Sequence, residues 1–492
     1  MKVLVVNFLW LTLAQAQILD IAQNICEFGP GPKELSCLVQ TLQSDFQAGD
    51  LLTDVAQLKV TCSDAFFYES VLNPGHLGRL PRLEDLQLDF CKVRQIPAET
   101  FAGLSNLKRL SLNSHNSEWS SILIDLDPRS LAGLSSLLDL NLAFNNLWSL
   151  PRDLLTSVPL LKALNVSFNH ILDMTDLGLT YEGQKSLEAI DLSHNFISSL
   201  RLTDLSLRSL KTLNLEYNRL KYLSDDCLNE VTNLQNLNFA HNQLAALPPQ
   251  VFNKNENLLK LQLQNNSLTL LTSELFANLA QLEKLNLSHN AISAHLLSAE
   301  TFAELKNLKV LDLSHNEMAD LNPEIFAPLE NLQILILDHN MIRKFEIQEI
   351  LPNLKVLSLN ENQLEKFDMK NATKLQKLDL NGNKLEKVDL TLESLQVLNL
   401  HGNELKSVPN LANLPSLQKL DLGQNYIEIL EPFQVSALTG LSLSGNILTS
   451  IDNNTFSNLT SLTLLNLASN GLSNIPQGEK RQKISKTMQL FS

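Results

Sequence analysis

One short motif recurs through most of the chain and limits what the chain can fold into. It has the form L-x-x-L-x-L-x-x-N-x-L, and a clear copy runs from Leu308 to Met318. Fifteen copies lie 20 to 26 residues apart, and two variant copies before them have Cys91 and His115 in the asparagine position. A repeat of this period indicates a solenoid rather than a set of separate globular domains. The motif asparagines are Asn145, Asn169, Asn195, Asn218, Asn242, Asn266, Asn290, Asn316, Asn340, Asn362, Asn383, Asn403, Asn425, Asn446 and Asn470.

The spacing of the leucines predicts the local structure of each repeat. In L-x-L, period-two alternation puts both leucines on one face of a short strand and the residue between them on the other. No single repeat can bury its own apolar face, so neighbouring repeats must stack. We therefore predict an α/β leucine-rich-repeat solenoid, a curved horseshoe with a parallel β-sheet on its concave face and irregular or short-helical segments on its convex face. The array should span residues 81–476 in about 17 repeats, after a cysteine-containing cap with a first irregular repeat at 17–80.

Two further positions have structural roles in this prediction. The motif asparagine lies where the strand turns inward, and its amide can donate and accept hydrogen bonds at once. Phenylalanines of the returning segments should stack into a spine inside the convex side. They are Phe101, Phe252, Phe276, Phe302, Phe326 and Phe456. After Asn340 the repeats shorten and this phenylalanine is mostly absent, which predicts a flatter or differently curved second half. The long interval from His115 to Asn145 predicts a protruding loop.

The N-terminus has the pattern of a secretory signal peptide. Lys2 precedes an apolar run at 3–13, and AQA at 14–16 fits the small-x-small rule for cleavage. The run is too short to cross a membrane, and no other stretch approaches the roughly 20 apolar residues that a spanning helix needs. We expect residues 1–16 to be removed and the protein to be secreted, with a membrane anchor only if the chain is part of a longer receptor.

Four of the five cysteines precede the regular repeats, which indicates disulfides in a cap formed in an oxidising compartment. The preferred pairs are Cys26–Cys37 and Cys62–Cys91, which would staple the end where the first repeat exposes its core. Other pairings among these four cysteines remain open. Cys227 is then expected to be a buried free thiol in a convex segment.

Charge and motif content exclude several classes of function. A net charge of −15 argues against nucleic acid and against anionic membranes as partners. The chain has no G-x-S-x-G, H-E-x-x-H, P-loop or Rossmann motif, and aspartates such as Asp312 are spread one per repeat. We predict no catalytic site, no cofactor and no metal site, and we interpret the chain as a binding protein rather than an enzyme.

The position just before each motif asparagine forms a column along one edge of the sheet. Exposed aromatic side chains in a row are candidate ligand contacts. The early members are Phe90, Phe144, Phe168 and Tyr217. The alternative is that these rings pack sideways on neighbouring turns. Later members are histidines, which could gain charge near about pH 6 or could be ordinary solvated residues. They are His194, His241, His289, His315 and His339.

Six Asn-x-Ser/Thr sequons are candidate glycosylation sites in a secreted chain. They begin at Asn165, Asn265, Asn286, Asn371, Asn453 and Asn458. Asn165 and Asn286 occupy the outward strand position, so glycans there would crowd the concave face. A ligand would then have to dock elsewhere, for example on a lateral edge. The alternative is that some sequons stay unmodified.

Several stretches between about residues 55 and 180 resemble the N-terminal ectodomain of Toll receptors, above all the longer invertebrate ones. They are LKVTCSDAFFYES at 58–70, DFCKV at 89–93, SLNSHNSEWSS at 111–121, LNLAFNNLWSLP at 140–151 and LNVSFNHILDMTDLG at 164–178. Generic repeats continue the resemblance to about residue 476. It implies a receptor ectodomain that recognises an extracellular protein ligand of the cystine-knot cytokine class, in innate immune or developmental signalling, and that dimerises with another leucine-rich-repeat receptor. Toll receptors also have cysteine-rich caps after the repeats, a transmembrane helix and a TIR domain, which this sequence does not contain.

The C-terminal tail leaves the origin of the chain open. Residues 477–492 are polar and basic and show no repeat. They fit a truncated receptor, a soluble decoy that captures ligand, or a complete short secreted protein. The alternative function is that of a secreted matrix or adhesion protein with the same repeats and no signalling role.

Overall fold

A computed structural model describes most of the chain. The described residues are 19–21, 24–31, 33–42, 54–63, 69–75, 77, 80–114, 123–179, 184–202, 207–348, 351–370 and 372–473. The predicted signal peptide, the predicted loop after His115, the sequon at Asn371 and the tail at 477–492 therefore lie wholly or largely outside them. The chain divides into two compact units, residues 1–197 with 204–210 and residues 198–203 with 211–492. This division falls inside the predicted repeat array.

The first unit is built on one sheet. Its strands are β1 (Leu19–Ile21), β2 (Asn24–Phe28), β3 (Glu34–Val39), β4 (Gln57–Cys62), β5 (Asp85–Asp89), β7 (Arg109–Asn113), β9 (Asp139–Asn141), β10 (Ala163–Asn165) and β11 (Ala189–Asp191). β1, β2 and β3 pair antiparallel, and the strands from β3 to β11 pair parallel. The parallel stack thus begins at β3, before the predicted start of the array, because β3 and β4 already alternate buried and outward side chains.

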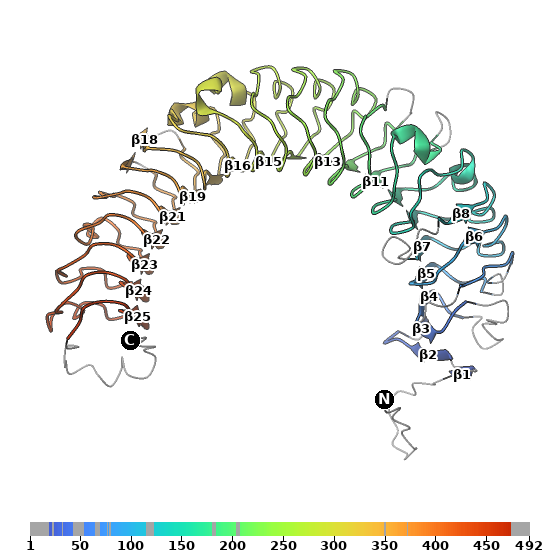
Figure 1. The fold of residues 1–492 in the computed structure, drawn as a ribbon, viewed down its shortest axis with the longest axis horizontal. Coiled ribbons are helices and arrows are strands. Elements are labelled where there is room, and N and C mark those ends of the chain that lie inside the picture. The colour runs from blue at the N-terminus through green and yellow to red at the C-terminus, as the bar shows by residue number, and fades with distance from the viewer. Residues whose placement is uncertain are drawn as a thin grey trace, which may run out of the picture. The chain divides into compact units, whose positions relative to one another are not determined.

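The second unit continues the same design with shorter strands. They are β12 (Thr212–Asn214), β13 (Asn236–Asn238), β14 (Lys260–Gln262), β15 (Lys284–Asn286), β16 (Val310–Asp312), β17 (Ile334–Ile336), β19 (Val356–Ser358), β21 (Lys377–Asp379), β22 (Val397–Asn399), β23 (Lys419–Asp421), β24 (Gly440–Ser442) and β25 (Leu464–Asn466). Each pair is parallel and aligns the same motif position, as Leu285 with Leu311 shows. Within this unit the strands line the inner side of the curve (Figure 1). The predicted parallel sheet is confirmed.

The convex segments contain little regular structure. The described part of the chain has no α-helix, only short 3-10 turns and two small parallel pairs of strands. The 3-10 turns are η2 (Leu154–Ser157), η3 (Met174–Leu177), η4 (Ala294–Leu296), η5 (Ala299–Phe302) and η6 (Pro323–Phe326). The strand pairs are β6 (Gln95–Ile96) with β8 (Asp125–Leu126) and β18 (Lys344–Gln348) with β20 (Lys366–Lys370).

A spine of phenylalanines runs inside the convex side of the second unit. Phe302 is fully buried between Phe276 and Phe326, with ring centroids 6.4 and 6.2 Å away. The expectation that the phenylalanines mostly disappear after Asn340 is wrong. Buried Phe345 stacks on Phe367 at 6.1 Å, and buried Phe433 stacks on Phe456 at 5.9 Å. Phe345 and Phe367 reach the spine from the convex strands β18 and β20.

The motif asparagines bind neighbouring repeats together. The Nδ2 group of Asn316 donates to the carbonyl oxygens of Leu287, Leu313 and Ser314 at 3.0–3.1 Å, and its Oδ1 accepts from the Ile292 N–H at 2.9 Å. Similar sets recur along the stack at Asn169, Asn195, Asn242, Asn266, Asn290, Asn340, Asn362, Asn383, Asn403, Asn425, Asn446 and Asn470. These amides satisfy buried backbone groups that water cannot reach.

Two disulfides close the N-terminal end of the first unit. Cys26 is joined to Cys37 across β2 and β3, and Cys62, the last residue of β4, is joined to Cys91, which follows β5. This is the preferred pairing from the sequence. Cys227 is free and buried, and burial raises the pKa of its thiol to about 12. It is therefore a protonated core residue at neutral pH, not a nucleophile.

Candidate binding surfaces

The column before the motif asparagines has an unusual backbone conformation. Phe144 and Phe168 have φ of 60° and 54°, in the left-handed region that residues other than glycine and asparagine rarely adopt. The backbone N–H of Phe144 donates to the Ser167 carbonyl at 3.1 Å, and that of Phe168 donates to the Ser193 carbonyl at 3.0 Å. One shared conformation and one shared hydrogen bond therefore place the column side chains of successive repeats directly above one another.

In the first unit this column is a stack of rings. The Phe144 and Phe168 ring centroids are 4.1 Å apart with planes 11° from parallel, and Phe168 lies 3.9 Å from His194 at 12°. The interpretation that the rings pack sideways on neighbouring turns therefore describes their contacts. It does not remove them from solvent, because Phe168 keeps 36% of its surface exposed.

A second run of rings lies on the turns that follow the same asparagines. Trp148 stacks on His170 with centroids 5.1 Å apart, and His170 meets the edge of Phe196 at 5.1 Å. Trp148 is 48% exposed. We call the two runs together the aromatic edge. Its members are Phe144, Phe168, His194, Trp148, His170 and Phe196. It presents large apolar side chains that are exposed and yet held in place by their neighbours.

In the second unit the column contains four histidines, at His241, His289, His315 and His339. His315 lies between His289 and His339, with ring centroids 3.9 and 4.2 Å away. Burial, together with the charges that His289 and His339 can carry, lowers the pKa of His315, and Asp312 and Asp338 oppose this effect. Parallel stacked rings do not aim their nitrogens at one point. Among the described residues there is no group of three or more histidine, cysteine or acidic side chains that could hold a metal ion.

The lowered pKa of His315 predicts a pH dependence of stability. A histidine whose pKa lies below 6.5 in the folded state binds its proton more readily when unfolded. Its contribution is full above pH 6.5 and is lost as the pH falls below that value. We expect the thermal unfolding midpoint to fall less between about pH 7.5 and about pH 5 in His315→Asn than in the native chain. The control is His295→Asn, an exposed histidine outside the stack, which should behave as the native chain does. An equal fall in all three proteins would contradict the prediction.

The concave face of the first unit contains a hollow of about 420 Å³. At one end the Arg109 guanidinium donates to Asp85 at 2.8 Å, and this hydrogen bond raises the pKa of Arg109. The small side chains of Ala163 and Ala189, on adjacent strands, leave the space open, and Asn165 lines it as well. The hollow is thus part of the strand surface that a ligand on this face would meet.

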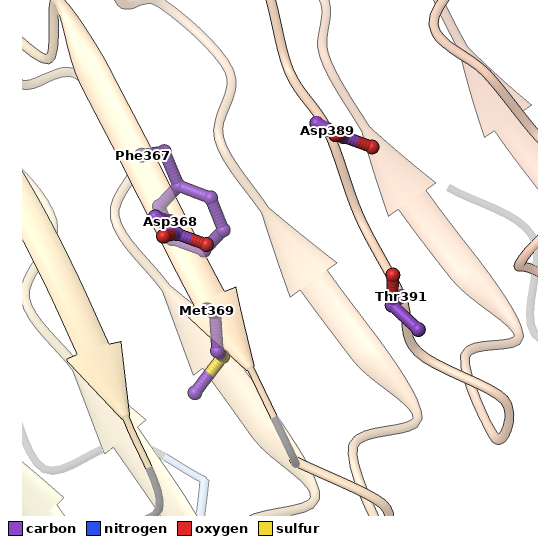
Figure 2. Close-up of a pocket in the computed structure, with 5 residues that line it drawn as sticks. All are labelled: Phe367, Asp368, Met369, Asp389 and Thr391. Carbon is purple, nitrogen blue, oxygen red and sulfur yellow. The ribbon is translucent and has the colours of Figure 1, made fainter.

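A smaller hollow of about 180 Å³ lies on the convex side of the second unit, next to β20. Figure 2 shows Phe367, Asp368 and Met369 on the strand, and Asp389 and Thr391 on the neighbouring segment. Phe367 and Met369 belong to the core. The polar groups are two carboxylates and one hydroxyl, which are too few to define a site.

Comparisons with known proteins agree with this geometry. The leucine rich repeat family profile matches residues 185–244, 232–292 and 294–342, and a two-copy profile of the same repeat matches 393–434. Fibromodulin of Oryctolagus cuniculus is 34% identical over 147 residues, which are 29% of this chain and 92% of that sequence. Toll-like receptor 7 of Drosophila melanogaster is 36% identical over 219 residues, which are 42% of this chain. The chain is a Toll-like member of the leucine-rich-repeat family.

This Toll-like protein spans only part of its receptor relatives. The alignment covers 15% of the Drosophila Toll-like receptor 7. In the solved complex of Drosophila Toll with Spätzle, the likeness covers 93% of this chain and 57% of the Toll chain, with a TM-score of 0.60 and 21% identity, which shows the fold. No helix in the described part of the Toll-like protein is long and apolar enough to cross a membrane.

The structure of the Toll-like protein brings together some of the predicted ligand contacts. Phe144 and Phe168 lie side by side in the first unit. Phe90 has the same positive φ, and Tyr217 belongs to the second unit, where it stacks on His241 at 3.9 Å. The contacts predicted from the sequence do not include Trp148, His170 and Phe196. Their signal is the recurrence of aromatic or imidazole side chains one and three positions after the motif asparagine.

Proposed function

We propose that this chain is an extracellular binding module that recognises a protein ligand through the aromatic edge. The observation that carries the proposal is that Phe168 and Trp148 are 36% and 48% exposed while their rings stay stacked. Aromatic anchors contribute most to protein interfaces. An anchor that is already immobilised loses little conformational entropy on binding, so a pre-stacked edge is suited to that task.

The likeness to Toll supports a proposal for the class of ligand. The Toll structure that this chain resembles was solved in complex with Spätzle. We infer a ligand of the cystine-knot cytokine class, bound for innate immune or developmental signalling with another leucine-rich-repeat receptor as the signalling partner. The net charge of −15 favours a basic ligand, as do Asp173 and Asp176, which follow His170 of the aromatic edge in the sequence.

Secretion and lack of catalysis are part of the proposal. The signal-peptide pattern at 1–16 supports secretion, and the sequons support glycosylation. Leucine-rich-repeat solenoids are typical of binding and receptor proteins, and the outward carboxylates of the strands lie one per repeat, as at Asp312 and Asp379. We infer that the chain needs no cofactor.

Binding to a cytokine panel tests the proposal. The secreted chain is immobilised, and Spätzle-class cystine-knot dimers from the same species are passed over it. We expect the double variant Phe168→Ala, Trp148→Ala to weaken binding by at least about 30-fold, because truncating an interface anchor costs about 2 kcal/mol or more.

The matched control removes exposed apolar side chains elsewhere. Tyr222 and Ile429, in the second unit, are 78% and 72% exposed, and Tyr222→Ala, Ile429→Ala should bind as the native chain does. Binding unchanged in the edge variant, or lost equally in the control, would show that the ligand docks elsewhere.

A second candidate is a matrix or adhesion protein without a signalling role. The similarity to fibromodulin favours it. Fractionation of a culture that secretes the protein into medium, cells and insoluble matrix separates the two candidates. A receptor-like or decoy protein should be found in the medium or on cells, whereas an adhesion protein should stay with the insoluble matrix.

A further inference from the structure

The sequon at Asn165 lies in the hollow of the first unit. The Oδ1 atom of Asn165 accepts a hydrogen bond from the Ser167 backbone N–H at 2.9 Å, which fixes the amide group. Its Nδ2 atom, the one that would carry a sugar, has no hydrogen-bond partner among the described residues. The fold therefore holds the side chain by its oxygen and leaves the nitrogen available.

Several equivalent asparagines without a sequon use their nitrogen differently, although Asn466 in the last strand, like Asn165, bonds only through its Oδ1 among the described residues. The Nδ2 group of Asn141, one strand earlier, donates to the Ser111 hydroxyl at 3.1 Å. In the second unit, the Nδ2 group of Asn399 donates to Asp379 at 2.9 Å. Both still accept a backbone N–H through Oδ1, as Asn165 does. The free nitrogen at Asn165 is therefore not a general property of this strand position.

The hollow has the size and the polar groups to hold a sugar. Its volume of about 420 Å³ lies within the roughly 300–1,000 Å³ typical of sites that enclose small organic molecules. Ala163 and Ala189 leave room beside Asn165, where the corresponding positions of the second unit often have longer side chains such as Lys284 and Ile334. The polar side chains that line it can hydrogen-bond hydroxyl and acetamido groups; they include Ser111, Asp139, Asn141 and Asp191.

We propose that Asn165 carries an N-linked glycan whose first sugar occupies this hollow. The glycan is transferred during secretion from a lipid-linked pyrophosphate oligosaccharide. A bond forms between Nδ2 of Asn165 and C1 of the first N-acetylglucosamine, and the bond from C1 to the pyrophosphate oxygen breaks. Nδ2 gives up one proton, and the lipid pyrophosphate leaves. The transfer precedes folding, so the folded strand has only to accommodate the sugar, which the free nitrogen and the two alanines allow.

The inferred glycan adds detail to the proposed function. It rests on the part of that proposal that places the chain outside the cell. A sugar in the hollow covers β9, β10 and β11 on the concave face, so a protein ligand cannot reach those strands. The rings of the aromatic edge lie on the turns outside this hollow, and the first unit contains no other sequon. We therefore infer that the glycan blocks the strands of this unit and leaves the aromatic edge as its ligand-binding surface.

Native deglycosylation followed by mass spectrometry tests the inference. The full chain is secreted from insect cells and treated with peptide-N-glycosidase before and after denaturation. We expect glycan on Asn165 to be released about tenfold more slowly than glycan on the exposed Asn453 in the folded protein, and equally fast after denaturation. Filling the hollow by Ala189→Leu, or by Ala163→Leu if the first variant folds poorly, should remove the protection.

The outcomes separate this inference from the proposed function. An empty Asn165 with glycan on Asn286 or Asn453, or equal release rates in the folded protein, would overturn the inference alone. A chain that is retained in the cells with every sequon empty would overturn the extracellular function and the glycan together. The variant Ser167→Ala removes the sequon but keeps Asn165, and it should eliminate the glycan without changing secretion.

Discussion

Replacing Phe302 with alanine is expected to lower the unfolding free energy of the second unit by about 3–5 kcal/mol. The ring is fully buried and lies between Phe276 and Phe326 in the convex spine. Its loss removes buried apolar surface and leaves a cavity that two stacked neighbours cannot fill. Denaturant unfolding followed by circular dichroism measures the change.

Two comparisons make this result specific to the spine. Phe302→Leu keeps most of the volume and should cost less than half as much as alanine. Ile429→Ala removes an exposed apolar side chain of the same unit and should have little effect. A loss below about 1 kcal/mol for Phe302→Ala would mean that the spine does not hold the repeats together.

Replacing Asn316 with alanine is expected to cost about 1–3 kcal/mol, although the side chain is small and touches no ligand surface. Its amide supplies an acceptor to the Ile292 N–H and donors to three carbonyl oxygens, all at 3.1 Å or less. Alanine leaves the Ile292 N–H without its acceptor in a buried place. The same denaturant experiment measures the loss.

Matched variants separate the contribution of the Oδ1 acceptor of Asn316 from that of its Nδ2 donor. Asn316→Asp keeps the acceptor but sets a carboxylate against the Leu287 and Leu313 carbonyls, so it should destabilise at least as much as alanine. Asn331→Ala removes a single exposed bond to the Lys306 carbonyl and should be nearly neutral. If Asn316→Ala proved as mild as Asn331→Ala, the ladder would not be a source of stability.

The sequence predicted the architecture because every repeat has the same two structural requirements, a buried face for its leucines and hydrogen-bond partners for its asparagine. Leucines such as Leu311 and Leu313 need a common buried face, and Asn316 needs carbonyl and N–H groups from adjacent turns. A stack of short parallel strands satisfies both at once. The division into two units, and the convex pair β18 and β20, were not predicted, because they depend on packing among the irregular returning segments.

The column of the aromatic edge could be predicted, but its full membership could not. Counting back from the motif asparagine finds Phe144 and Phe168. Trp148 and His170 stand three positions and one position after their asparagines, so the sequence pattern does not indicate that their rings stack. The free nitrogen of Asn165 is likewise invisible in the sequence, where it and Asn141 follow the same pattern apart from the sequon.

An experimental structure of the secreted chain is the most direct test of the central claim, that leucine layers sealed by asparagine amides hold a row of rings open to solvent. We predict density in which Leu313 and its equivalents point inward, the Asn316 amide bridges neighbouring turns, and the rings of Phe144, Phe168 and His194 stack on one edge. Leucines of the motif facing solvent, or rings turned into the core, would contradict the account.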